Sequence, residues 1–157
     1  MDVVFALEEA PENIKYSIFL AGPTSREGGA DSWRKTALQI LKDEGFTGTV
    51  FVPEARDWVK YNPEYEAQIL WEDKFLNIAS CILFWIPRDL DKLPGFTTND
   101  EWGFWKASGK VVLGAPENAP KVSYQKYYAL RLKVPFSTSL TKTVQNALDK
   151  LEDQNGH

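Results

Sequence analysis

The stretch that decides the fold is Phe96-Thr-Thr-Asn-Asp-Glu-Trp-Gly-Phe-Trp-Lys-Ala-Ser-Gly-Lys110. It lies between two strongly apolar segments, residues 78–86 before it and residues 111–114 after it, and both are typical of buried strands. The stretch itself carries a helix start signal at Thr98 and a helix stop signal at Gly109. The order strand, loop, helix, strand predicts a parallel βαβ unit.

Two carboxylates, Asp100 and Glu101, lie near the predicted start of this helix. Glu101 stands three residues after Thr98, which is the spacing of a capping box, and a Glu in that place usually only binds the backbone of its own helix. The start of the helix also lies just beyond the carboxyl end of a strand, where open α/β sheets bind ligands. A capping role and a functional role for Glu101 are both open at this point.

The composition is that of one globular domain, residues 1–157, in which residues 1–15 form an N-terminal arm or loop. Hydrophobic residues make up 43% of the chain, which is too many for a disordered protein. The formal net charge of −4 argues against a nucleic-acid surface, because such a surface needs clustered Lys and Arg. No stretch reads as a membrane span or a signal peptide, so we expect a cytoplasmic protein that binds neither nucleic acid nor membranes.

Two residue counts exclude whole classes of mechanism. The one cysteine, Cys81, lies in the most apolar predicted strand, and the one histidine is the last residue, His157. A disulfide framework, a Cys/His zinc site and a Ser-His or Cys-His catalytic pair therefore cannot be built. We expect no metal and no cofactor, and if the protein is an enzyme its carboxylates are the natural catalysts. Glycosyl transfer is a common use of such carboxylates.

Strand-like and helix-like segments alternate along the chain. Besides the two strands named above, strands are expected over residues 16–21, 48–52 and 134–136. The alternation predicts a three-layer α/β/α fold of the flavodoxin or Rossmann type, with a mainly parallel sheet of about five strands in the order 2-1-3-4-5. In that order the loops after the first and third strands face each other across one crevice, so Glu101 should face the loop at residues 22–29.

The loop Gly22-Pro-Thr-Ser-Arg-Glu-Gly-Gly29 is rich in small residues and hydroxyls and carries one Arg. Backbone N–H groups of such a loop can hold a phosphate or a ribose. The loop lacks the spacing of a Walker loop or a dinucleotide fingerprint, so a plain flexible connection is an equal alternative. Glu54 and Arg56 follow the second strand on the same side of the sheet, either as ligand-binding residues or as a solvated ion pair.

The predicted second helix, which starts near Asn62-Pro63, carries polar residues inside its apolar face. Gln68 and Glu72 fall in the middle of that face, whereas Asp73 falls on the opposite side. An inward carboxylate needs a partner, and a wet cleft for a polar ligand, an oligomer interface and a buried ion pair are three solutions. The apolar arc contains Tyr65, Ile69, Trp71, Phe75, Leu76, Ile78 and Ala79. This arc and six Trp exceed what one small domain needs to cover its sheet, so we expect a homo-oligomer.

A set of short motifs follows the predicted elements in order: Phe19-Leu-Ala-Gly-Pro23, Ser32-Trp-Arg34, Val52-Pro-Glu54, Trp71-Glu72, Leu83-Phe-Trp-Ile-Pro-Arg88, Pro94-Gly-Phe-Thr-Thr-Asn99, Glu101-Trp-Gly103 and Ser108-Gly-Lys110. Over about residues 17–121 this set resembles the nucleoside 2-deoxyribosyltransferase family, and more narrowly its deoxyribosyltransferase-like branch. Each motif is short, but the ordered set is fairly specific.

The resemblance implies a reaction. In that family a Glu on the helix after the third strand attacks C1′ of a 2′-deoxynucleoside, expels the base and forms a deoxyribosyl-enzyme, which a second base or water then resolves. Glu101 matches that position, where a carboxylate at a helix mouth should stay ionised. Asp100 would assist protonation of the leaving base. The residue pattern and the resemblance together predict a substrate-binding set of Gly22, Pro23, Ser25, Arg26, Glu54, Gln68, Glu72, Arg88, Phe96, Thr98 and Asn99.

The chain departs from well-studied members of the family at two positions, and one of its loops is similar to that of a particular group of members. Phe19 stands where well-studied members carry a Tyr that orients the nucleophile, and Gly95 stands where they carry a base-binding Asp. The loop Ser25-Arg-Glu-Gly-Gly29 is similar to the 5′-phosphate loop of members that cleave deoxynucleoside monophosphates. Three functions are therefore compatible with the sequence: an N-deoxyribosyltransferase, a 2′-deoxynucleoside 5′-monophosphate N-glycosidase, and a non-catalytic nucleotide-binding module. The expected partners are a small nucleoside or nucleotide and a free nucleobase.

Overall fold

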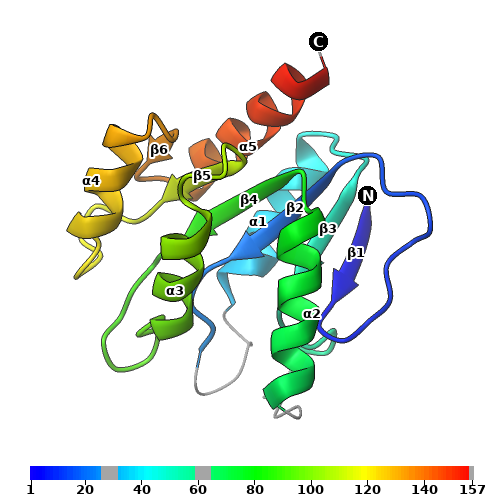
Figure 1. Ribbon diagram of the computed structural model, residues 1–157, viewed down its shortest axis with the longest axis horizontal. Helices are drawn as coiled ribbons and strands as arrows, with labels where there is room; N and C mark the ends of the chain where they lie inside the picture. The colour runs from blue at the N-terminus through cyan, green and yellow to red at the C-terminus, as the bar shows by residue number, and fades with distance from the viewer. Residues whose placement is uncertain (26–31, 59–64, 156–157) are drawn as a thin grey trace.

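In the computed structural model, which describes residues 1–25, 32–58 and 65–155, six strands form one open sheet in the order β1-β3-β2-β4-β5-β6 (Figure 1). Every neighbouring pair of strands is parallel. The strands are β1 (Asp2–Phe5), β2 (Ser17–Ala21), β3 (Thr49–Val52), β4 (Cys81–Trp85), β5 (Val111–Gly114) and β6 (Phe136–Ser137). The predicted parallel pairing of β4 with β5 is confirmed, with Ile82 opposite Val111.

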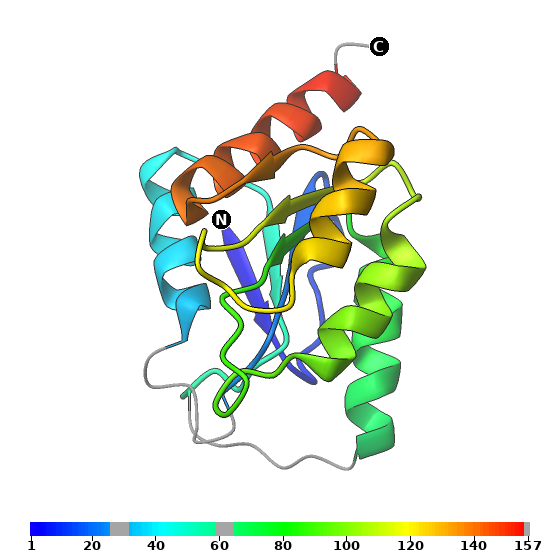
Figure 2. The ribbon, with the colours of Figure 1, turned by 90° about the vertical axis from the view of Figure 1, so that its left-hand side faces the viewer.

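Five helices of the described residues cover the two faces of the sheet, as Figure 2 shows. They are α1 (Trp33–Asp43), α2 (Tyr65–Ile78), α3 (Phe96–Trp105), α4 (Ser123–Arg131) and α5 (Leu140–Asn155). Side chains of α1 and α5 pack into one apolar core, and side chains of α2, α3 and α4 pack into the other, on the opposite face. The predicted three-layer α/β/α fold is confirmed. No helix in the described part of the chain is long and apolar enough to cross a membrane.

The N-terminal arm predicted over residues 1–15 is partly wrong, because residues 2–5 form β1. This strand pairs with β3 from Asp2 opposite Thr49 to Phe5 opposite Val52, and it buries Val4 and Phe5. A four-residue strand between acidic residues carries too little pattern to be recognised in the sequence. The other five strands keep the predicted order, so β1 adds one edge strand and leaves the switch point between β2 and β4.

The start of α3 also differs from the prediction. The helix begins at Phe96, its N-cap is Gly95 in the left-handed conformation (φ 67°), and no side chain caps it. Thr98 is therefore a buried residue of the first turn and Glu101 lies in the second turn, so no capping box forms. The capping interpretation of Glu101 is wrong, and its carboxyl group is available for another role.

The apolar arc predicted for α2 is too wide. Trp71, Phe75, Leu76 and Ala79 are buried, but Tyr65, Ile69 and Ile78 are exposed. The buried face contacts the sheet through Trp71, which packs against Phe19 of β2, and through Phe75, which stacks on Phe51 of β3. The first turns of α2 extend past the strand ends and line the cavity described below.

Candidate active site

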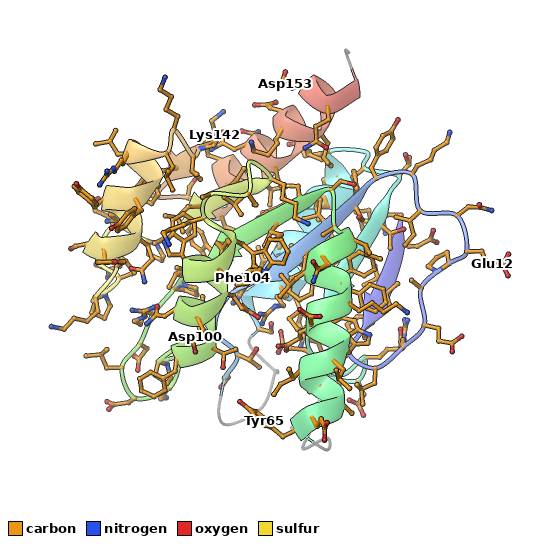
Figure 3. The ribbon with its side chains drawn as sticks, viewed as in Figure 1. Glu12, Tyr65, Asp100, Phe104, Lys142 and Asp153 are labelled. Atoms are coloured by element: carbon orange, nitrogen blue, oxygen red, sulfur yellow. The ribbon has the colours of Figure 1, made fainter. Side chains whose placement is uncertain are left out.

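A cavity of about 280 Å³ opens at the carboxyl ends of the central strands. Its walls are the loop after β2, the residue Pro53 after β3, the first turns of α2, and the start of α3 with the loop before it. Figure 3 labels Tyr65 on the first turn of α2 and Asp100 on α3, the two helices that form opposite walls. The cavity thus lies at the topological switch point, where the strand order predicts a ligand site.

The loop after β2 approaches the end of β4 very closely at Gly22. A Cβ atom on Gly22 would lie 2.1 Å from the carbonyl oxygen of Trp85 and 2.8 Å from the Trp33 ring, and its φ is 155°. Trp33 Nε1 donates to the carbonyl oxygen of Pro23 at 3.1 Å and fixes the next residue of the loop. Only glycine fits at position 22, and this requirement shapes the floor of the cavity.

A buried ion pair supports this floor. Arg34 Nη1 lies 3.0 Å from Glu54 Oε2, and only 1% of the Arg34 side chain is exposed. The same guanidinium donates to the carbonyl oxygens of Leu20 (2.9 Å) and Gly22 (2.6 Å) and to Thr24 Oγ1 (3.0 Å). The pair ties the β2–α1 loop to the end of β3, and Glu54 is held behind Arg34 instead of lining the cavity.

Arg34 is the main site residue that the sequence analysis missed. It lies on the same helical face as Ala37 and Leu41, at spacings of three and seven residues, and all three are buried. A cation at an inward position of an amphipathic helix needs a buried acceptor, and Glu54 at a strand end is such an acceptor. The spacing of Arg34 from Ala37 and Leu41 is the feature of the sequence from which its inward position could have been predicted. Arg56, in contrast, forms an exposed ion pair with Glu8 at 2.6 Å, away from the cavity.

Glu72 on α2 and Glu101 on α3 bring two carboxyl groups into one cavity. Gln68 Nε2 donates to Glu72 Oε1 at 2.7 Å, and Asp73 is solvated, so the helical wheel gave the correct direction for all three residues of α2. Burial raises the pKa of Glu72, while the Gln68 hydrogen bond and the Arg34 charge oppose this shift. The pair of carboxyls is the central chemical feature of the site.

Burial also raises the pKa of Glu101 to about 8, with a further contribution from the negative charge of Glu72. The Arg34 charge opposes this shift and Asp100 adds to it. The prediction that Glu101 stays ionised at a helix mouth is therefore wrong. The physical reason is that Glu101 lies in the second turn, beyond the free N–H groups of the helix start, and is half-buried beside another acid.

The cavity brings together seven of the predicted site residues: Gly22, Pro23, Gln68, Glu72, Phe96, Thr98 and Glu101. Its walls also include eight residues that were not predicted: Thr24, Arg34, Pro53, Tyr65, Ile69, Pro94, Gly95 and Thr97. Most of these lie within two residues of a predicted one, so the sequence located the segments better than the individual side chains.

Several predicted site residues do not line the cavity. Asp100 is exposed, and Ser25 is absent from the described lining. Arg88 and Asn99 bind each other instead, because Arg88 Nη2 donates to Asn99 Oδ1. Successive helical residues point about 100° apart, so Asn99 and Asp100 cannot share a direction with Thr98 and Glu101. Arg26 lies outside the described residues.

The sequence matches one family model, described as "Nucleoside 2-deoxyribosyltransferase like", over residues 15–119, about two thirds of the chain. The matched region runs from just before β2 to beyond β5 and includes the cavity residues of α2 and α3. No curated protein matched the chain. Among the described residues, no group of three or more His, Cys, Asp or Glu side chains could hold a metal ion.

Proposed function

The chain belongs to the nucleoside 2-deoxyribosyltransferase-like family, and we propose that it cleaves the N-glycosidic bond of a 2′-deoxynucleoside and transfers the sugar to another base. The observation that carries this proposal is the pair Glu72 and Glu101, which line one cavity from two helices. Two carboxyl groups beside a scissile glycosidic bond are the usual catalytic arrangement for this chemistry.

In the first step, a Glu101 carboxylate oxygen attacks C1′ of the sugar and forms the C1′–O bond. The C1′–N bond breaks, and its electron pair goes to the nitrogen of the base. The base takes a proton and leaves, and the sugar stays on Glu101 as an ester. In the second step, a nitrogen of the incoming base attacks C1′, the Glu101 carboxylate leaves, and the incoming base loses its proton. Two inversions give retention at C1′.

The proton for the leaving base comes from Glu72 in this proposal. Asp100, the residue first expected to assist this step, is exposed and outside the cavity. Burial raises the pKa of Glu72, so its carboxyl holds a proton more readily than a solvated Glu. Glu72 would give this proton to the leaving base and recover it from the incoming base, as general acid and then general base.

Because the pKa of Glu101 is raised, this mechanism requires that the reaction itself favour the ionised form of Glu101. With a pKa of about 8, Glu101 is mostly protonated at pH 7, whereas a nucleophile must be ionised. The transition state of glycosyl transfer carries positive charge at C1′, and that charge stabilises the ionised form of a neighbouring carboxylate. A buried carboxylate therefore gains more from the transition state than a solvated one does.

The mouth of the cavity is apolar and open. Tyr65, Ile69 and Phe96 line the cavity although 75%, 46% and 71% of their surfaces are exposed. Exposed apolar side chains around a polar site are typical of a surface that another molecule covers. We propose that a second copy of the chain covers this rim, and light scattering at micromolar concentration tests it: a monomer would contradict this part of the proposal.

A chromatographic screen tests the function. Purified protein is incubated with each 2′-deoxynucleoside and each 5′-monophosphate, with and without an added free base, and the products are separated. A transferase gives a new nucleoside only when the second base is present, whereas an N-glycosidase releases base and sugar without it. Glu101→Gln is the matched control, and its turnover should fall by about 10³-fold or more because the nucleophile is lost. Substrate-induced thermal stabilisation without any product would support a binding module instead.

A further inference from the structure

Helix α3 carries Glu101 but is only lightly anchored. Of its ten residues, Thr98 and Trp102 are buried and Trp105 is partly buried against the same core. Trp102 packs edge-on against Phe84 of β4 with 5.4 Å between ring centroids, whereas Phe96 and Phe104 are exposed. A helix with so few buried side chains can rotate about its axis more easily than one with a full apolar stripe, so other contacts help to fix its orientation.

A polar cluster on the side of α3 away from the cavity supplies such contacts. Asn99 Oδ1 accepts hydrogen bonds from Arg88 Nη2 and from Gln125 Nε2, the second at 2.9 Å. Arg88 Nη1 donates at 2.7 Å to the carbonyl oxygen of Lys121, in the turn before α4. The side-chain oxygen of Asn99 on α3 is therefore bound from two sides, by the loop that follows β4 and by the start of α4.

This cluster is a costly way to stabilise a fold. Arg88 is buried, yet no carboxylate of the described residues forms an ion pair with it, and burial lowers its pKa. Arg88 Nε and Gln125 Oε1 are both buried without a hydrogen-bond partner. An uncompensated buried cation stabilises a protein poorly, so its contribution is better explained by the geometry that it imposes on α3.

We propose that Arg88 and Asn99 are positioning residues that fix the rotation of α3 and thereby direct the Glu101 carboxyl into the cavity. Asn99 and Glu101 are two residues apart, about 200° around the helix, so holding Asn99 toward α4 holds Glu101 toward α2. A rotation of about 10° would move a carboxyl about 6 Å from the helix axis by about 1 Å. A displacement of that size costs on the order of 10²-fold in rate.

In this proposal Arg88 acts on Glu101 by fixing the position of α3 and not through its charge. The charges that shift the pKa of Glu101 are those of Glu72, Arg34 and Asp100, and Arg88 is not among them. Loss of the Arg88 charge should therefore leave the pH midpoint of activity unchanged while it lowers the rate. This inference rests on the proposed function, since it assigns a role to Glu101 in catalysis.

Two matched variants of Asn99 test the proposal. Asn99→Leu removes the accepting oxygen, whereas Asn99→Asp keeps an oxygen for both donors. We expect kcat to fall about 10²-fold in Asn99→Leu with KM changed less than about threefold, and Asn99→Asp to stay within about threefold of the wild type. Arg88→Met should reproduce the loss, Arg88→Lys should restore part of it, and Phe104→Leu, an exposed change on the same helix, should have no effect.

Hydrogen exchange gives a second readout that needs no substrate. The α3 amides should exchange faster in Asn99→Leu than in Asn99→Asp, while the amides of β4 stay protected in both. Wild-type kcat in Asn99→Leu, or an equal loss in Asn99→Asp, would overturn the proposal. A loss that disappears on cooling as the folded fraction recovers would overturn it too. If the wild type turns over no substrate, the proposed function fails. Unchanged α3 exchange in Asn99→Leu would then separately reject the positioning role of Arg88 and Asn99.

Discussion

The substitution Glu101→Gln should make the protein more stable at alkaline pH, although it removes the proposed nucleophile. Burial and Glu72 raise the pKa of Glu101 from 4.5 to about 8. Below pH 4.5 both the folded and the unfolded chains carry the proton, and Glu101 contributes nothing to the pH dependence. Between pH 4.5 and 8 the unfolded chain loses the proton while the folded chain retains it, so the free energy of unfolding falls as pH rises. Gln at the same position carries no titrating proton and removes this fall.

The magnitude follows from the size of the shift. Each pKa unit corresponds to about 1.4 kcal/mol, so a shift from 4.5 to about 8 sets an upper bound of about 5 kcal/mol. With a folded-state pKa of about 8, the folded chain keeps most of this proton between pH 6 and pH 8, whereas the unfolded chain has already lost it. Over that range the variant should therefore gain up to about 2 kcal/mol on the wild type. In a domain of this size that gain corresponds to about 4–8 °C in Tm.

Urea and thermal unfolding at pH 5.5, 6, 7, 8 and 9 measure this difference directly. All other titrating groups are common to the two proteins, so subtracting one curve from the other isolates Glu101 together with its coupling to Glu72. Glu66→Gln, at an exposed position on α2, is the matched control for the loss of one carboxyl group. Parallel stability curves for wild type and Glu101→Gln, with a constant gap at every pH, would show that Glu101 is not buried beside Glu72 as described.

Three further predictions test other parts of the site. Glu72→Gln removes the negative charge beside Glu101, so the pKa of Glu101 should fall below about 8 and the alkaline loss of stability should shift to lower pH, measured by the same unfolding series. Gly22→Ala should destabilise the fold by about 3 kcal/mol or more in urea unfolding, because its Cβ would lie 2.1 Å from the carbonyl oxygen of Trp85. Arg34→Met leaves Glu54 buried without its cation and should cost about 3–5 kcal/mol, and the double variant with Glu54→Gln should recover a large part of this loss; no recovery would contradict the described ion pair.

The fold was predictable where the sequence carries strong periodicity. The apolar runs of β2, β4 and β5 and the alternation with helices fixed the layers and the order of five strands. The strand β1 escaped prediction because pairing with β3, a tertiary contact, decides its structure rather than its own short pattern. The start of α3 escaped for a similar reason. Gly95, in a left-handed conformation, is the N-cap of this helix, three residues before Thr98, the cap that local rules favour.

The site was predictable in outline only. Strand order placed the loop after β2 opposite α3, and the helical wheel directed Gln68 and Glu72 inward, because both inferences depend on geometry that the sequence encodes locally. The pKa of Glu101 was not predictable, since it depends on the burial of the group and on the charge that another helix brings beside it. Thr98 and Asn99 point about 100° apart on α3, and this follows only once both residues are known to lie inside the helix.

The structure gives a physical reason for the glycine at position 95. Gly95 has a φ of 67°, which disfavours most side chains, and a Cβ atom there would lie 3.2 Å from Cβ of Pro23. The close contact joins the loop before α3 to the loop after β2 and closes one side of the cavity. A side chain at position 95 would strain this turn and press against Pro23, so position 95 can offer a bound ligand only its backbone. Gln68 and Tyr65 on α2 are polar side chains of the opposite wall, and under the proposed function we expect them to contact the base.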